Sequence, residues 1–420
     1  MIKERWLHLS NIYADGAKRF LSPEPLSIRQ ELSECFNGPE GTMSIGGQNR
    51  IRVLCVTPVG PEGMGGVDRL YFYMRQYMAE KGGSSDLDIH YFASRGPRSG
   101  VMSIFSFPRR FLLFIWLLAT RSFDVVHVNH STNGSALRKW ALVSVAKLFG
   151  KRVTTHFHGM IEDRTYARNP LWLRALAAMS RKSDRIIILG DFFSCQFRER
   201  LNIPAEKLTV IHNGIPDFAG DAPLAKEQDG ERLILFAGEV GPRKGAGLLL
   251  EALAGLKQQA KDWRCVIAGN GDLPEYQSMA RMLGLMDKVR FTGWVGSDEV
   301  HALMRDAAIV VLPSRIEALP LSLIEGACAG AALVSSNAGA SAEVAVEGRN
   351  GHVVPLDSAA ITDALADLLN NPARLRAMQV ESRKLFAERF RIEQFEQALR
   401  VVLVSVADRR IATSPVVSVA

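Results

Sequence analysis

The feature that most constrains this 420-residue chain is the stretch 312–330, which reads Leu-Pro-Ser-Arg-Ile-Glu-Ala-Leu-Pro-Leu-Ser-Leu-Ile-Glu-Gly-Ala-Cys-Ala-Gly. The continuous apolar run 307–312 is typical of a strand that is covered on both faces of a parallel sheet. After a short loop, Pro320 suits the first position of a helix, because its missing N–H would be unpaired there anyway. The free amides of that first turn, together with the helix dipole, predict an anion site.

Two carboxylates bracket the predicted anion site. Glu317 lies in the loop before the helix, and Glu325 lies more than one turn inside it. A site that holds an anion at its amides and hydroxyl groups at its carboxylates suits a sugar nucleotide. The alternative is an unrelated pair, with one carboxylate in a loop and the other on a helix surface.

Length and charge restrict the remaining possibilities. A chain of 420 residues exceeds what one hydrophobic core usually supports, so two domains are expected. The net charge of +7 favours anionic partners such as nucleotide diphosphates or acidic lipid head groups, and no nucleic-acid-binding signature is present. The five cysteines are scattered and no signal peptide is visible, which predicts a reducing, cytoplasmic location without a disulfide framework.

Strand, loop and helix patterns recur along most of the chain and predict an α/β protein with two doubly wound, Rossmann-like domains. We expect a poorly ordered N-terminal extension at 1–50, a first domain at 51–216, a second domain at 217–392, and a C-terminal helix and tail at 393–420. The predicted strands are 51–57, 124–129, 153–159, 184–189, 208–212, 232–237, 263–268, 290–295 and 307–312. The predicted helices include 67–81, 170–182, 195–201, 357–370, 372–390 and 395–407.

The Glu-x7-Glu spacing resembles the signature of retaining glycosyltransferases of family 4, which have the GT-B fold. Ser314-Arg315 before the two glutamates, Pro320 between them and Gly-Ala-Cys-Ala-Gly after them strengthen the resemblance, which covers roughly 51–407. It implies two Rossmann-like domains facing a cleft, an acceptor-binding first domain, a donor-binding second domain, and a last helix that crosses back to the first domain. It also implies sugar transfer, with retention, from a nucleotide-diphosphate sugar to a saccharide or lipid-linked acceptor in polysaccharide or envelope glycan synthesis. Neither a catalytic metal nor another cofactor is expected from this resemblance.

The resemblance assigns site residues. Glu317 would position the donor sugar, Glu325 would bind the ribose, and Lys244 would neutralise the diphosphate. The loop 238–245 carries Glu239 where the family has arginine, and Arg243 could supply that charge. The remaining implied site residues are His158 near the transferred sugar, the loop residues Gly65, Gly66 and Gly269, the base-side residues Trp294 and Val295, and the helix-start residues Leu321 and Ser322.

Structural alternatives accompany several of these residues. Gly65-Gly66 could be a plain tight turn, the basic turn at 243–244 could be merely solvated, and Trp294 could be a core residue. No G-x-G-x-x-G motif indicates a nicotinamide cofactor. Three more histidines lie near strand ends without a metal-ligand spacing, and we expect them to be hydrogen-bonded structural residues: His127, His130 and His156.

The segment 95–121 has an unusual composition. It carries five arginines, no Asp or Glu, and the apolar run 111–119, which is far too short to span a bilayer. Such a run suits either a buried helix or an interfacial helix whose arginines meet anionic lipids. The flanking arginines favour membrane contact, as a peripheral protein on the inner face of the membrane.

Two other functional classes stay open at this stage. One is a GT-B enzyme that does not transfer sugar to an acceptor, such as a sugar-nucleotide epimerase. The other is a non-catalytic protein that binds a sugar nucleotide. The sequence leaves the base, the sugar, the acceptor and the oligomeric state undetermined.

Overall fold

The computed structural model describes residues 50–59, 65–82, 86–95, 102–131, 134–161, 170–220 and 230–408. Several predictions fall outside these residues: the extension before residue 50, the loop part 60–64, positions 96–101 of the arginine-rich segment, most of the linker after 220, and the tail 409–420.

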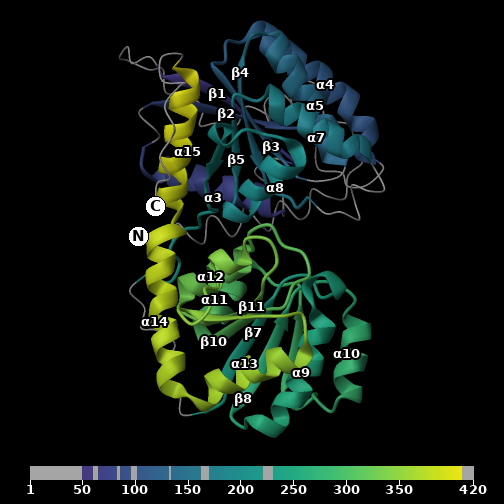
Figure 1. Cartoon of the computed structure of the whole chain (residues 1–420), viewed down its shortest axis with the longest axis vertical. Coiled ribbons are helices and arrows are strands. Elements are labelled where there is room, and N and C mark those ends of the chain that lie inside the picture. Colours follow the sequence, from purple (N-terminus) through teal and green to yellow (C-terminus); the bar gives the residue numbers. More distant parts are fainter. Residues whose placement is uncertain are drawn as a thin grey trace, which may run out of the picture. The chain divides into compact units, whose positions relative to one another are not determined.

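Two six-stranded parallel sheets make up the described part of the chain, which confirms the predicted fold class (Figure 1). The first has the strand order β2-β1-β3-β4-β5-β6, and the second has the order β12-β11-β10-β7-β8-β9. The first-sheet strands are β1 Ile51–Thr57, β2 Leu87–Ala93, β3 Val125–His130, β4 Arg152–Phe157, β5 Arg185–Ile188 and β6 Leu208–Val210. The second-sheet strands are β7 Arg232–Ala237, β8 Trp263–Ala268, β9 Val289–Gly293, β10 Ala307–Leu312, β11 Ala332–Ser336 and β12 Gly351–Val354.

The strand order reverses between β1 and β3 in the first sheet and between β7 and β10 in the second. Ligands of open α/β sheets bind beyond the carboxyl ends of the strands at such switch points. The loops that follow β1, β3, β7 and β10 are therefore the places where each sheet is expected to bind its ligand.

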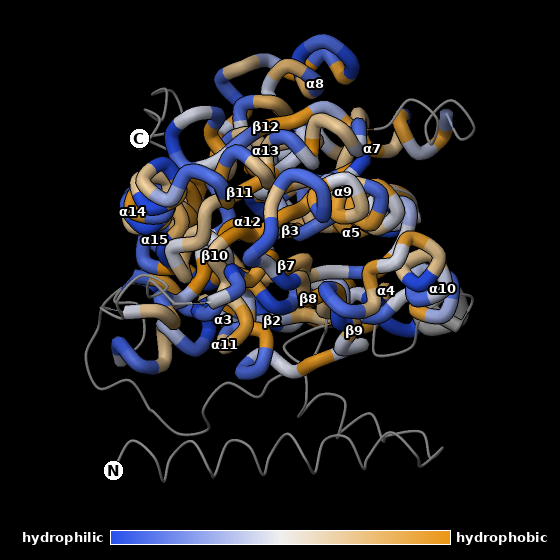
Figure 2. The backbone as a smooth tube through the Cα atoms, turned by 90° about the horizontal axis from the view of Figure 1, so that it is seen from below, coloured by the Kyte–Doolittle hydropathy of each residue, from blue (hydrophilic) through white to orange (hydrophobic). Residues whose placement is uncertain are grey.

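Helices cover the sheets. Those of the first half are α3 Gly66–Glu80, α4 Met102–Thr120, α5 Gly134–Leu148, α7 Pro170–Lys182 and α8 Asp191–Leu201. Those of the second half are α9 Ala246–Gln259, α10 Leu273–Met282, α11 Ser297–Asp306, α12 Leu321–Ala329, α13 Ser358–Asn370, α14 Pro372–Arg389 and α15 Ile392–Ala407, with short 3₁₀ turns η2 Ala205–Lys207, η3 Pro242–Lys244 and η4 Ser341–Glu343. The central strands β7 and β10 and helix α12 are largely hydrophobic, whereas outer helices such as α8 carry hydrophilic residues (Figure 2).

Several predicted boundaries differ from the observed ones for local reasons. Pro320 precedes α12 in an extended conformation (ψ 118°), and its carbonyl accepts the first helical hydrogen bonds, so it caps the helix instead of starting it. Helix α8 begins at Asp191 and not at residue 195, because Gly190 ends the strand and Phe193 is already in the core. The strand β2 was not predicted, because it is an edge strand with part-exposed charged residues and lacks a continuous apolar run.

The chain crosses between its two halves twice, and these crossings pair with each other. Ile215 donates to the carbonyl of Phe390 at 2.9 Å and accepts from the amide of Ile392 at 2.9 Å. A side chain on Gly214 would lie 2.6 Å from the carbonyl oxygen of Arg391, so the close approach requires glycine. Helix α14 packs on α12, whereas α15 packs on α3 and the strands of the first sheet.

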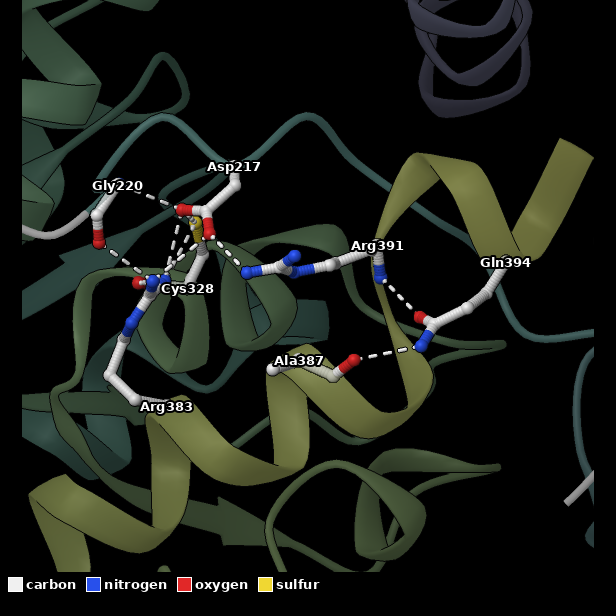
Figure 3. A network of polar contacts seen from close by, with 7 residues as sticks. All are labelled: Asp217, Gly220, Cys328, Arg383, Ala387, Arg391 and Gln394. Carbon is white, nitrogen blue, oxygen red and sulfur yellow. Dashed lines mark hydrogen bonds and ion pairs between the residues drawn. The ribbon is translucent and has the colours of Figure 1, made fainter.

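Asp217 anchors this crossing (Figure 3). Its carboxylate accepts two hydrogen bonds from Arg383, both 3.0 Å long, and one from Arg391 at 3.1 Å. The amide of Gly220 adds a bond of 2.9 Å. Burial raises the pKa of Asp217, but the hydrogen bonds from Arg383 and Gly220 and the charges of the two arginines outweigh it and hold the pKa below its usual value.

Candidate functional site

The loop between β10 and α12 brings the predicted glutamate and lysine together. Glu317 is buried, and its Oε1 accepts hydrogen bonds from Ser314 Oγ at 2.8 Å and from the Nζ of Lys244. The loop is held from below by Gly339 (φ +58°), where a Cβ would lie 2.0 Å from the carbonyl oxygen of Glu317. A cation and a carboxylate therefore meet at the β7/β10 switch point.

Glycine allows the β7 loop to reach this point. Gly245 has φ +76°, and a Cβ there would lie 2.0 Å from the carbonyl oxygen of Pro313. The amide of Arg315 also donates to the carbonyl of Arg243 at 2.9 Å, so the two loops lie side by side. Gly269 likewise packs its backbone on Gly238, with a Cβ position 1.9 Å from that carbonyl oxygen. Close loop packing alone is therefore enough to explain why glycine stands at position 269.

Arg243 lies apart from this group. Its Nη2 forms an exposed ion pair with Glu239 Oε2 at 2.8 Å, four residues earlier in the same loop. The structure thus joins Arg243 to the residue that replaces the family arginine, and it joins Lys244 to Glu317. Of the two predicted loop cations, only Lys244 contacts the acid.

Glu325 is 3% exposed in α12 and faces a partner that sequence reasoning missed. Nη2 of Arg69, in α3, lies 2.9 Å from Glu325 Oε1 as an ion pair without the alignment of a hydrogen bond. Burial raises the pKa of Glu325, and the charge of Arg69 opposes that rise. The sequence could have indicated Arg69 as a site residue, because it stands three residues after Gly66, one helical turn inside α3.

The starts of α3 and α12 face each other. Gly65 precedes α3 in an extended conformation, and a Cβ on Gly66 would lie 3.8 Å from the side chain of Leu321. Leu321 and Ser322 form the first turn of α12, whose amides precede the first helical hydrogen bonds. Two helix N-termini with glycine at one of them make a suitable surface for a diphosphate.

His158 follows β4 and is oriented by Asn129, at the end of β3. The side-chain NH2 of Asn129 donates to the carbonyl of Val56 at 3.2 Å and to the sulfur of Cys55 at 3.6 Å. Its oxygen must then face Nε2 of His158, 2.9 Å away, so Nε2 carries the proton and Nδ1 is left as an acceptor. Desolvation, followed by the nearby histidines, lowers the pKa of His158 well below its usual value, which keeps the ring neutral.

The other three histidines differ from one another. His127 and His156 are buried and share the hydroxyl of Tyr71, at 2.6 Å and 3.3 Å, which agrees with a structural role. His130 is buried as well, but neither ring nitrogen makes a well-formed hydrogen bond in the described part of the chain, and the backbone of Ser131 is the nearby polar group that acts on its ring. Within the same residues, no cluster of three His, Cys, Asp or Glu side chains could hold a metal ion.

Trp294 is 62% exposed after β9, so the core alternative for it is wrong. Val295 beside it is part-exposed. Gly293, with φ +71°, turns the chain at this point. An exposed aromatic ring beyond the end of a second-sheet strand is available to a planar ligand.

Comparison with known proteins agrees with this architecture. The described fold is similar to the Anabaena protein HepE in complex with UDP and glucose, with a TM-score of 0.67 and 15% identity over 85% of this chain and 100% of that one. It is also similar to the lipopolysaccharide outer core galactosyltransferase WaaB, with a TM-score of 0.62 and 17% identity over 84% of this chain and 99% of that one. The two sheets therefore define a GT-B protein.

The family follows from sequence comparison. Residues 64–217 match the model of Glycosyltransferase Family 4, and residues 223–385 match the model of Glycosyl transferases group 1. The chain belongs to the family 4 glycosyltransferases.

Two mycobacterial relatives are named as mannosyltransferases, one of phosphatidyl-myo-inositol and one of phosphatidylinositol monomannoside. A phosphatidyl-myo-inositol mannosyltransferase of Mycobacterium leprae is 34% identical over 61% of this chain and 66% of its own length. A GDP-mannose-dependent alpha-(1-6)-phosphatidylinositol monomannoside mannosyltransferase of Mycolicibacterium smegmatis is 28% identical over 56% of this chain and 65% of its own. This chain thus matches just under two thirds of the length of each.

Proposed function

We propose that this protein transfers a sugar from a nucleotide-diphosphate sugar to a lipid-linked or saccharide acceptor, with retention at the anomeric carbon. The single observation that carries the proposal is the contact of Lys244 and Ser314 with Glu317 at the β7/β10 switch point, beside the first turn of α12. A cation and free amides suit a departing diphosphate, and the carboxylate suits sugar hydroxyls.

Each residue then has a defined task. Lys244 and the amides near Leu321 and Ser322 neutralise the diphosphate as it leaves. Glu317 positions the donor sugar and stabilises positive charge that develops on it. Glu325 accepts hydrogen bonds from the ribose, and neutral His158 offers Nδ1 to a hydroxyl group of the sugar. The departing phosphate takes the acceptor proton, so the chemistry needs no separate base and no metal.

Two variants test this proposal. We expect Lys244→Ala and Glu317→Ala each to lower kcat by about a hundredfold or more, because each removes electrostatic stabilisation of the transition state. Transfer would be followed with GDP-mannose and UDP-glucose, since the names of the relatives and neighbours point to these nucleotides. Lys257→Ala, at a surface lysine of the same half, is the matched control. Near-normal transfer by both site variants would end the proposal.

The alternative functions give different outcomes in the same assay. A sugar-nucleotide epimerase would convert the donor without added acceptor and would release no free nucleoside diphosphate. A non-catalytic binding protein would bind nucleotide in calorimetry without turnover.

Membrane contact by the first half is also part of the proposal. Among the described residues, no helix is long and apolar enough to cross a membrane. Helix α4 buries Phe114, Leu117 and Leu118, while Leu112 (66% exposed) and Trp116 (46% exposed) lie on its open side. The buried and the interfacial interpretations thus each describe one side of the helix. The open side, with Arg109 exposed on it, suits peripheral binding to an anionic inner leaflet.

A further inference from the structure

The carboxyl end of β2 is surrounded by positive side chains that the donor chemistry does not use. The Nζ of Lys139, in α5, donates to Ser94 Oγ at 2.5 Å. Nη1 of Arg110, in α4, donates to the carbonyl oxygen of Ala93 at 2.7 Å. The Lys139 side chain is only 2% exposed, although the residue lies in α5, a helix that covers the sheet. Two cations from different helices therefore converge on the last residues of one strand.

Two arginines extend this group, and we call Arg95, Arg110, Arg138 and Lys139 the cation cluster. The charge of Arg95 acts on Arg138, and the charge of Arg138 acts on Lys139, so neighbouring members repel each other. Asp68 is the acid whose charge reaches Lys139, yet none of the ion pairs found in the described residues includes this lysine. A buried ammonium group without a paired carboxylate is costly.

Neutral polar groups with unused capacity lie at the neighbouring strand ends. Both ring nitrogens of His130, the last residue of β3, are buried and make no well-formed hydrogen bond among the described residues. The hydroxyl oxygen of Thr57, at the end of β1, is likewise unpartnered there. The Thr57 carbonyl binds both the amide and the hydroxyl of Ser94, each at 2.9 Å, which ties β1 to the cluster. Buried polar groups are nearly always satisfied, so these unpartnered groups point to a missing ligand.

We propose that the cation cluster binds a phosphate group carried by the acceptor. This inference rests on the proposed function and specifies its acceptor as a phosphate-bearing molecule. A phosphate brings up to two negative charges and several acceptor oxygens, which match several cations and the hydroxyl of Thr57. The site also stands at the β1/β3 switch point of the first sheet, where a ligand of this half is expected.

Burial, and then the charge of Arg138, lowers the pKa of Lys139 to about 7 in the free protein. A bound phosphate would favour the charged ammonium, so binding near pH 7.5 should take up a proton. That uptake is measurable by calorimetry, because the observed heat then changes between buffers of different ionisation enthalpy. Phosphate itself also ionises near this pH, so the uptake assigned to Lys139 is the part that is lost in a Lys139→Met variant.

The test compares inorganic phosphate with acetate at matched ionic strength, by calorimetry on the full chain. We expect wild-type protein to bind phosphate with proton uptake and Lys139→Met to bind it at least tenfold more weakly and without the uptake assigned to Lys139. Because the Lys139 amine is mostly neutral in the free protein near pH 7.5, its removal should leave the protein folded, and a thermal melt checks this. Lys151→Met, which removes a lysine charge from the same half, is the control and should behave like wild type. Equal binding by Lys139→Met and wild type, or equal response to acetate and phosphate, would overturn the proposal.

Two further arms identify the source of the phosphate. Soluble glycerol 3-phosphate is compared with vesicles of phosphatidylcholine that contain phosphatidic acid. Dependence on Lys139 in the soluble arm assigns a soluble phosphate, and dependence in the vesicle arm alone assigns a lipid head group. Dependence in neither arm refutes the proposal. The Lys244→Ala variant separates the two hypotheses, because it should lose donor turnover while it keeps the phosphate response.

Discussion

Replacing Arg69 by methionine tests whether its ion pair prepares Glu325 to bind ribose hydroxyls. The charged atoms are 2.9 Å apart, and for unit charges at that distance Coulomb's law at an effective dielectric constant of 20 gives roughly 6 kcal/mol as an upper limit. The Arg69 side chain is 29% exposed, and desolvation of both groups opposes their attraction. We therefore expect a net coupling free energy between Arg69 and Glu325 of about 2 kcal/mol. That energy corresponds to about a thirtyfold change in an equilibrium constant.

The direction of the effect follows from the pKa of Glu325. Burial raises this pKa and Arg69 opposes the rise, so the Arg69→Met change should raise the pKa further. A protonated carboxyl group is a poorer acceptor for ribose hydroxyls. We therefore expect the affinity for a nucleoside diphosphate to fall about thirtyfold at pH 7, and the loss to shrink as the pH rises and Glu325 ionises.

Calorimetry with UDP and GDP between pH 7 and 9 measures this effect. The set comprises Arg69→Met, Glu325→Gln and the double variant, with Arg75→Met in the same helix as the control. Coupled residues give a double variant little worse than the weaker-binding single variant. If the two single effects simply add, or if the Arg69→Met loss is the same at pH 7 and pH 9, the reasoning is refuted.

Three further predictions concern stability. Burial lowers the pKa of His127 and His130 to about 3 and those of His156 and His158 well below 6.5, so these rings stay neutral in the folded protein and become charged in the unfolded one. Below about pH 6.5 each should lower the free energy of unfolding by up to about 1.4 kcal/mol per pH unit, and urea melts at pH 8, 6 and 5 that show no such loss would contradict this. Gly245→Ala should cost at least about 2 kcal/mol in the same urea melts and also slow turnover, because its Cβ would collide with Pro313, whereas Gly241→Ala has open space and is the control. Asp217→Asn should lower the free energy of unfolding by about 2 kcal/mol near pH 7. Because the pKa of Asp217 is depressed in the folded protein, this difference from wild type should vanish as the pH falls through that pKa. A difference that stays constant with pH would contradict the role of the arginine pairs.

The sequence predicted the elements whose signal is local. The mainly apolar runs of β1, β7, β8 and β10 predicted their strands with the correct limits, because a strand buried on both faces carries its own pattern. Elements that depend on tertiary context were missed, such as the edge strand β2 and the half-exposed helix α11. Their residues alternate between buried and exposed positions that only the packed neighbours define.

The candidate site likewise combines features that have a local sequence signal with features that depend on tertiary contacts. The spacing of Glu317 and Glu325 predicted a loop-and-helix motif, and the structure places both acids as expected along the chain. The partners of these acids come from far away in sequence: Lys244 is 73 residues from Glu317, and Arg69 belongs to the other half of the chain. The pairing of Arg243 with Glu239 is the exception, because these two residues stand only four positions apart in one loop.

Glycines connect the two levels of explanation. Residues 214, 245, 269 and 339 each stand where a Cβ would lie within 2.6 Å of a backbone atom from a distant segment. A sequence shows the glycine but not the segment that approaches it. Function in this fold depends on loops that touch backbone to backbone, so charged groups such as Lys244 and Glu317 can be held together with little freedom. Charged motifs in the sequence therefore identify the two acids but not the backbone contacts that hold their loops in place.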